Sequence, residues 1–309
     1  MNNAPAIRSV TGSIDALAGR TVRGLSIANI AAQIGIIVTG GAVRLTSSGL
    51  GCSSWPQCEP GEFTPTFQVA ATIHPFIEFG NRVLTGVLLV IAVLLAVAVW
   101  RAFPRLKWWG IVPGIGVLAQ AVLGGIVVIF DLDPVLVGLH MLISAALVWF
   151  SVYLALRVRD APRRNGRPLA GLRRIFGLLL IAVVVMGVLT TGAGPHSGDA
   201  NANDRLSLDP ALLARGHAAT VWLFIAFLAV LIVSVRNDRS VGEHDEVRKA
   251  WIVLLAITLL QGAIGYTQYF TGLPELLVGL HMFGIGLLVA AHSAVNYLLR
   301  GNSIASSRA

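Results

Sequence analysis

Long runs of apolar residues, separated by short polar segments, dominate this chain. A helix of about 20 apolar residues crosses the roughly 30 Å hydrocarbon core of a bilayer. Eight runs have this length and are predicted to span the membrane: Leu25–Val43, Val83–Trp100, Trp109–Phe130, Val135–Leu156, Ile175–Gly194, Ala218–Val235, Trp251–Phe270 and Leu276–Leu298. The pattern therefore predicts an all-α polytopic membrane protein with eight transmembrane helices.

Composition agrees with this prediction and changes how the charge is interpreted. Of the 309 residues, 55% are hydrophobic and 12% are charged, and the mean hydropathy is +0.77. A water-soluble domain of this composition would expose large apolar patches, so lipid is the expected solvent. The net charge of +8 is spread over short clusters between apolar runs, which indicates membrane topology and argues against a nucleic-acid partner.

Basic residues alternate from loop to loop and so predict an orientation. They gather in the two terminal segments and after the second, fourth and sixth predicted spans, whereas the other loops are acidic or neutral. By the positive-inside rule, both termini lie in the cytoplasm. We therefore expect a multi-pass protein of the cell inner or plasma membrane, with the acidic and neutral loops on the outer side.

Two parts of the sequence repeat each other. The segment Gln120–Gly124 leads to Leu136–Met141 (LVGLHM), and Gln261–Gly265 leads to Leu277–Met282 with the same letters LVGLHM and the same separation. Internal repeats of this kind are common in membrane folds built from duplicated units. Spans three and four therefore correspond to spans seven and eight.

A weaker similarity extends the repeat to the first span of each half. Thr39 and Gly40 end the first span, and Thr191 and Gly192 end the fifth. Because four spans is an even number, the halves share one orientation. The sequence thus predicts two pseudo-symmetric four-helix bundles: an N-terminal half (1–160), an arginine-rich cytoplasmic linker (161–172) and a C-terminal half (173–309).

Histidines recur where predicted spans begin on the outer side. His140, His217 and His281 stand at the starts of spans four, six and eight, and His74 lies just before span two. Facing imidazoles in a four-helix bundle commonly hold a haem iron from both sides, so His217 and His281 are a candidate axial pair. The alternative is that these histidines only form hydrogen bonds between helices.

The N-terminal half lacks one member of the corresponding pair. His140 matches His281, but Asn81 stands where a partner equivalent to His217 is expected. On a continuous helix, His74, Glu78 and Asn81 share one face. Glu78 is a candidate to relay protons or to position water, and an ion pair with Arg82 is the alternative interpretation.

Both cysteines, Cys52 and Cys58, lie in the first outer loop. The outer compartment is oxidising, so a disulfide between them is expected. A structural role and a redox role for this pair both remain open, because two cysteines alone do not reveal a reduction potential.

Taken together, these motifs resemble the haem A synthase family, which converts haem O to haem A for cytochrome oxidase. The resemblance covers nearly the whole chain. It is carried by Val38–Thr46 with Ser48–Leu50 and the Cys52–Cys58 loop, the Glu78 segment, Gln120–His140, Thr191–Asp199, His217 and Gln261–His281.

The resemblance implies a role for each half. The C-terminal half would carry haem b on His217 and His281, and the N-terminal half would oxidise the C8 methyl of haem O to a formyl group. Glu78 matches the family's functional glutamate, while Asn81 stands where the family has a histidine. Three arrangements follow for the substrate iron: His140 is the sole ligand, which we expect, or His74 replaces the missing ligand, or one face of the iron is accessible to water.

The function expected from the sequence is a membrane oxidoreductase. Arg44, Arg82 and Arg215 are candidates to attract haem propionates. The expected partners are haem O, membrane lipid and an electron donor that the sequence does not identify; a haem O synthase and a second copy of this chain are further candidates. Two rival functions are a di-haem b-type or quinone-linked electron-transfer cytochrome, and a transporter with parallel repeats.

Overall fold

A computed structural model of the chain describes residues 4–66, 72–160, 170–200, 202, 204–236 and 245–300. Within these ranges the chain forms helices and loops, without an extended strand. The helices are α1 (Ala4–Leu45), α2 (His74–Ala102), a 3-10 turn (Pro104–Leu106), α3 (Lys107–Ile129), α4 (Pro134–Val158), α5 (Ala170–Ala193), α6 (Pro210–Arg236), α7 (Asp245–Phe270) and α8 (Glu275–Leu298).

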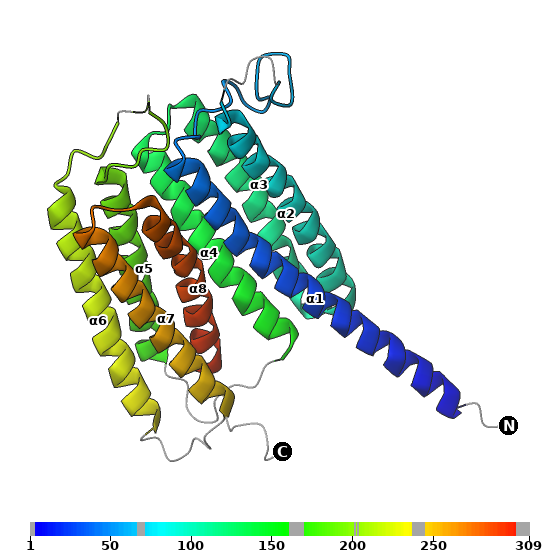
Figure 1. Ribbon diagram of the computed structural model, residues 1–309. Coiled ribbons are helices and arrows are strands. Elements are labelled where there is room, and N and C mark those ends of the chain that lie inside the picture. The colour runs from blue at the N-terminus through cyan, green and yellow to red at the C-terminus, as the bar shows by residue number, and fades with distance from the viewer. Residues whose placement is uncertain are drawn as a thin grey trace.

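Eight of these helices are long and apolar enough to cross a membrane, which confirms the predicted fold class. They run side by side as one bundle (Figure 1). Residues 161–169 of the predicted linker lie outside the described part, and residues 170–172 belong to α5. The division into halves at this linker stays a prediction.

The starts of the even-numbered helices explain how the histidines come to one end of the bundle. Helix α2 begins at His74, well before the predicted span at Val83, with Pro75 in its first turn. Proline suits that position because its missing N–H would have no partner there. At α4, the Asp133 carboxylate accepts hydrogen bonds from the N–H groups of Val135 (2.9 Å) and Leu136 (3.0 Å), which caps the helix. We call the end where α2, α4, α6 and α8 begin the histidine end.

Helices from the two halves pack closely at the centre of the bundle. Helix α1 contacts both α4 and α8, and α4 also contacts α8 and α5; α1, α4 and α8 lie in the middle of Figure 1. Small residues permit the approach: a Cβ added at Gly41 of α1 would lie 3.0 Å from the Met282 sulfur of α8. Buried polar groups also join helices here, as where the Asn29 amide donates to the Ser151 hydroxyl (2.9 Å).

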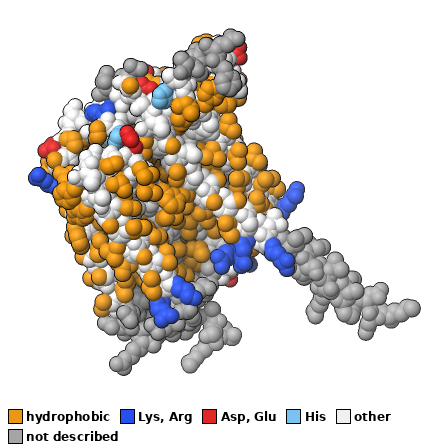
Figure 2. All heavy atoms as spheres, viewed as in Figure 1, with side chains coloured by type: hydrophobic (Ala, Val, Ile, Leu, Met, Phe, Trp, Pro, Cys, Tyr) orange, Lys and Arg blue, Asp and Glu red, His pale blue; other side chains and the backbone are white. Residues whose placement is uncertain are grey.

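The remaining surface is apolar around the bundle and basic near one end. Valines and leucines of α2 are exposed along its outer face, and apolar side chains cover most of the face in Figure 2, with arginine and lysine mainly at the lower rim. At that basic end, His292 of α8 is buried and accepts a hydrogen bond from the Trp149 indole (3.2 Å). The sequence assigned no role to His292 or to His244, and His244 lies outside the described residues.

Candidate functional site

Two imidazoles face each other in the C-terminal half. His217 on α6 and His281 on α8 lie with their ring centroids 6.4 Å apart and their planes at 84°. The Nδ1 atoms of both rings are buried and have no hydrogen-bond partner among the described residues. The structure therefore brings together the two residues that the sequence paired, and it leaves these nitrogens unsatisfied by protein groups.

Glycines on neighbouring helices make the space that these imidazoles occupy. A Cβ added at Gly187 of α5 would lie 3.1 Å from Cε1 of His217, and one added at Gly265 of α7 would lie 3.3 Å from Cε1 of His281. Both distances are shorter than ordinary carbon–carbon contact, about 3.5–4.0 Å. Each glycine thus allows one imidazole to lie flush against the adjacent helix.

This donor pair fits a haem iron. Two imidazole nitrogens bound to one metal lie roughly 4 Å apart, at about 2 Å from the metal each. Ring centroids 6.4 Å apart leave room for such an arrangement, and two neutral imidazoles are suitable axial ligands for haem. His217 and His281 are the residues that would hold this group.

The N-terminal half repeats part of this geometry. A Cβ added at Gly124 of α3 would lie 3.5 Å from Cε1 of His140 on α4. Within the described part of the chain, the Nδ1 atom of His140 is also buried without a hydrogen-bond partner. One turn before Gly124 on α3, the Gln120 amide donates to the His140 carbonyl (2.8 Å) and to the Ser144 hydroxyl (2.5 Å). The glycine–histidine part of the repeat is therefore also a repeat in space, whereas the hydrogen bonds of Gln120 belong to the N-terminal half.

Asn81 is engaged with α1 and has no hydrogen bond to His140 among the described residues. The Thr39 hydroxyl of α1 donates to the Asn81 amide oxygen (2.7 Å). In the other half the equivalent Thr191 donates to the carbonyl of Gly187 (2.9 Å) on its own helix. The two halves differ here in hydrogen bonding as well as in sequence.

His74 is held by the loop that follows α1. Its Nδ1 atom lies 2.9 Å from the Ser48 hydroxyl, at hydrogen-bond distance. Because α2 begins at His74 and is continuous, His74, Glu78 and Asn81 share one helix face, as predicted. The structure gives His74 a protein partner and leaves its role as a replacement ligand a prediction.

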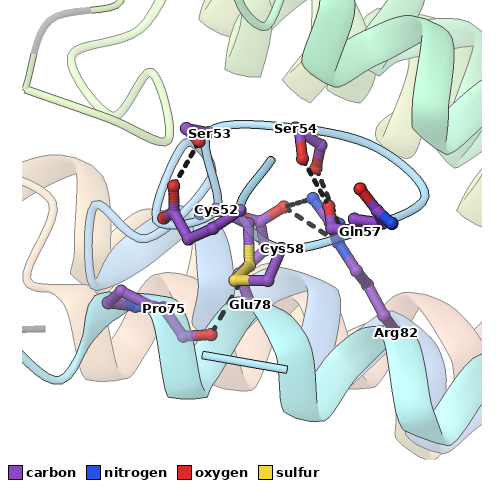
Figure 3. Close-up of a disulfide and its surroundings, with 9 residues drawn as sticks. Cys52, Ser53, Ser54, Gln57, Cys58, Pro75, Glu78 and Arg82 are labelled. Atoms are coloured by element: carbon purple, nitrogen blue, oxygen red, sulfur yellow. Dashed lines mark hydrogen bonds and ion pairs between the residues drawn. A yellow bond between two sulfur atoms is a disulfide. The ribbon is translucent and has the colours of Figure 1, made fainter. Parts of the chain in front are cut away.

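Glu78 is the most buried carboxylate in this region, with 5% of its surface exposed. Its Oε2 accepts a hydrogen bond from the Cys52 N–H (2.7 Å), and its Oε1 accepts from Arg82 Nε (3.1 Å) and Nη2. Figure 3 shows both side chains rising from α2 toward the loop. The ion pair with Arg82 is therefore present, and both carboxylate oxygens are engaged.

Arg82 also fixes the loop above it. Its Nη1 donates to the carbonyls of Ser54 (2.9 Å) and Gln57 (3.0 Å). Both carbonyls belong to the segment closed by the Cys52–Cys58 disulfide. The structure confirms this predicted disulfide (Figure 3). The carboxylate, the arginine and the disulfide loop thus form one connected unit at the histidine end.

Arg44 joins the two halves. From the end of α1, its Nη2 donates to the carbonyls of Thr191 (3.0 Å) and His196 in the second half. Arg82 is likewise engaged with protein groups, whereas Arg215 on α6 is exposed. Sequence alone does not reveal these tertiary partners, nor the bonds made by Thr39 and the Cys52 N–H, because each bond joins segments that are distant along the chain.

The fold and this site define a polytopic membrane protein with paired imidazoles suited to haem and an unequal second site. The model of the cytochrome oxidase assembly protein family matches residues 23–202, and the chain belongs to this family. It is 25% identical over 292 residues to a protein named heme A synthase from Bacillus licheniformis, covering 87% of this chain and 93% of that protein.

Two further relatives carry the same name. The heme A synthase of Bacillus pumilus is 27% identical over 294 residues, covering 86% of this chain and 91% of that protein. That of Geobacillus kaustophilus is 24% identical over 300 residues, covering 91% of both chains. The resemblance seen in the motifs is therefore confirmed over most of the chain.

Proposed function

We propose that this chain is a haem A synthase: a membrane oxidoreductase that oxidises the C8 methyl of haem O to a formyl group. The name shared by its relatives supports this reaction. The observation that carries the proposal is the inequality of the two halves. His217 and His281 face each other as a pair, while the position matching His217 is Asn81, which is bonded to Thr39.

The C-terminal pair suits a permanent cofactor. His217 and His281 would hold haem b there, and this group would supply one-electron transfer. The glycines at 187 and 265 keep the adjacent helices close to the rings, so the ligands are held in fixed orientations. The protein's contribution in this half is binding and orientation.

The N-terminal half suits a substrate that must leave. We assign His140 as the sole protein ligand of haem O, because the amide oxygen of Asn81 already accepts a hydrogen bond from the Thr39 hydroxyl. A single axial ligand holds the substrate more weakly than two. Glu78 is assigned the handling of protons, and its hydrogen bonds from Cys52 and Arg82 orient the carboxylate in this half.

The orientation follows from the charge pattern. Arginine and lysine gather at the end opposite the histidines, so we propose that the histidine end faces outward and both termini lie in the cytoplasm of a bacterial-type plasma membrane. The oxidising outer compartment is where the Cys52–Cys58 disulfide would persist. We propose dioxygen as the oxidant of this four-electron step: one of its oxygen atoms enters the product, and the others leave as water. An electron donor is then the partner that supplies electrons to reduce oxygen to water, and a haem O synthase is the partner that supplies the substrate.

The test is to purify the protein, record its redox spectra and identify extracted haems by chromatography after supply of haem O. The expected result is one bound haem b and the appearance of haem A. Finding only haem b after haem O has been supplied with a reductant and oxygen would contradict the proposal and favour a di-haem b-type cytochrome.

Two variants separate the halves. His281→Ala is expected to remove the haem b spectrum, and His140→Ala is expected to keep that spectrum while abolishing haem A formation. Because the two histidines occupy matching places in the repeat, each variant serves as the structural control for the other. Loss of the haem b spectrum in His140→Ala, with that spectrum kept in His281→Ala, would contradict the assignment of the halves.

A further inference from the structure

The tryptophan of the disulfide loop, Trp55, lies against α3, one residue after the glycine that faces His140. A Cβ added at Gly125 of α3 would meet the Trp55 indole at Cδ2 (2.6 Å), Cε2 (2.7 Å) and Cε3 (2.9 Å). The ring therefore lies flat against the backbone of α3. The preceding residue, Gly124, is the one that faces His140, so the indole and the imidazole lie against consecutive residues of one helical turn.

The backbone that carries this indole is anchored at several points. The Cys52–Cys58 disulfide closes the segment, and Arg82 donates to the carbonyls of Ser54 and Gln57 on either side of Trp55. Figure 3 shows Arg82 reaching from α2 to this loop. Because Arg82 also binds Glu78, the position of the indole is tied to the carboxylate of the same half.

The indole itself is not a core side chain. It is 39% exposed, although its backbone is fixed by the bonds above. One face of Trp55 thus packs on glycine, and the rest is available to another apolar group.

The repeat shows that the other half closes the same place differently. Gly124 and Gly125 correspond to Gly265 and Tyr266, so the C-terminal half has a side chain where the N-terminal half has none. The Tyr266 hydroxyl accepts a hydrogen bond from the Trp222 indole (3.1 Å). At this position of the repeat, side chains of two helices, α6 and α7, bond to each other, whereas the side chain that covers Gly125 comes from a loop.

We propose that Trp55 is a substrate-contacting residue that forms the outer wall of the N-terminal site and packs on the porphyrin of haem O. This inference rests on the proposed function. A porphyrin is a large, flat, apolar π system, and an indole offers the matching surface. A side chain on a loop can move aside to let such a substrate enter and leave. The site of a permanent cofactor does not need a movable side chain of this kind.

The experiment measures release rather than turnover. Purified protein is loaded with haem O and mixed with excess apomyoglobin as a haem acceptor, and the transfer is followed by absorbance. Trp55→Ala is expected to speed release of haem O about tenfold, the size of effect that loss of an aromatic contact produces. Trp55→Phe keeps an aromatic surface and is expected to release haem O at nearly the wild-type rate.

A second variant tests the same wall from the other side. Gly125→Ala leaves the indole intact but places a Cβ within 2.6 Å of it, so the ring must move, and release is expected to speed up as in Trp55→Ala. Trp108→Ala, at a tryptophan 67% exposed in the first turn of α3 at the basic end, is the matched control and is expected to leave release of haem O unchanged. The haem b spectrum confirms in each case that the protein is folded.

Release at the wild-type rate in both Trp55→Ala and Gly125→Ala would overturn the inference, as would a wild-type protein that holds no haem O in this half. Failure of the proposed function is seen separately. If the wild type binds and releases haem O but never forms haem A, the reaction is wrong, and the release rates still decide whether Trp55 contacts the bound haem.

Discussion

The Thr39 hydroxyl donates a hydrogen bond to the amide oxygen of Asn81 at 2.7 Å, and this bond joins α1 to α2 in the N-terminal half. The equivalent residues of the other half, Thr191 and His217, have no such bond among the described residues. Asn81 is therefore hydrogen-bonded within the protein. Because it stands where a histidine is expected, the N-terminal site lacks one imidazole ligand for an iron.

Replacing Asn81 by histidine is expected to convert the N-terminal site to two-imidazole ligation. The haem of this half should then give the spectrum of the His217–His281 haem and should leave the protein more slowly, because a second axial bond must break. Absorption and electron paramagnetic resonance spectra of the loaded variant measure this. Asn81→Ala is the control, and a change of ligation in that variant would contradict His140 as the sole protein ligand.

Removing Arg82 is expected to destabilise the fold through the charge it leaves behind. The side chains of Arg82 and Glu78 are 17% and 6% exposed. Arg82→Met therefore leaves a buried carboxylate without its ion-pair partner, which lowers the free energy of unfolding by about 3 kcal/mol. Thermal unfolding in detergent measures this loss. The double variant Glu78→Gln with Arg82→Met should regain most of it, and equal unfolding temperatures for the single and double variants would refute the coupling.

Glu78→Gln alone is expected to abolish haem A formation while both haem sites stay filled. Glutamine keeps the size and much of the hydrogen bonding of the side chain but cannot take up a proton as a carboxylate does. Extracted haem content and product formation are measured on one preparation. Wild-type product formation in this variant would remove Glu78 from the reaction.

Opening the disulfide is expected to reduce activity more than stability. The Cys52–Cys58 bridge closes a short loop, with a sequence separation of 6, so its contribution through chain entropy is about 2 kcal/mol. The same loop supplies the Cys52 N–H to Glu78, and a loosened loop would release that contact. The variant Cys52→Ser with Cys58→Ser, compared with the wild type in unfolding temperature and product formation, tests this; full activity would show that the loop holds Glu78 without the bridge.

Filling the glycine beside an imidazole is expected to lower occupancy of the C-terminal haem. Gly187→Ala places a Cβ 3.1 Å from Cε1 of His217, closer than normal contact, whereas a Cβ at Gly262 meets nothing within 4 Å. Haem b content per protein should fall in Gly187→Ala and stay at the wild-type value in Gly262→Ala. Equal haem content in the two variants would show that the ring tolerates the shift.

The sequence was sufficient for the helices and for the pairing of His217 with His281. Apolar length determines a membrane span, and a motif repeated at one separation places equivalent residues in equivalent positions. The apolar run marks α2 only from Val83, because the polar residues at its histidine end, among them Glu78 and Arg82, interrupt the run; the helical spacing of His74, Glu78 and Asn81 indicated the earlier turns. These residues remain helical because their polar groups are satisfied by the loop above.

Contacts between distant segments could not be predicted from the sequence. Thr39 meets Asn81, and Trp55 meets Gly125, only because of how α1, α2 and α3 pack. One signal was available: Gly125 stands where the repeat has Tyr266, and a missing side chain in one copy of a duplicated wall indicates that something else fills the space.

The contacts of Arg44 have a consequence for how the molecule can be divided. This side chain leaves the last turn of α1 and binds carbonyls at the end of α5 and in the loop that follows it, while α1 also packs on α8. The segments before and after the predicted linker are therefore packed into one another and held together by these bonds. If the chain were expressed as two fragments divided between α4 and α5, each fragment would expose the helix surface that normally contacts the other. Only co-expression of the two fragments would restore a complete protein.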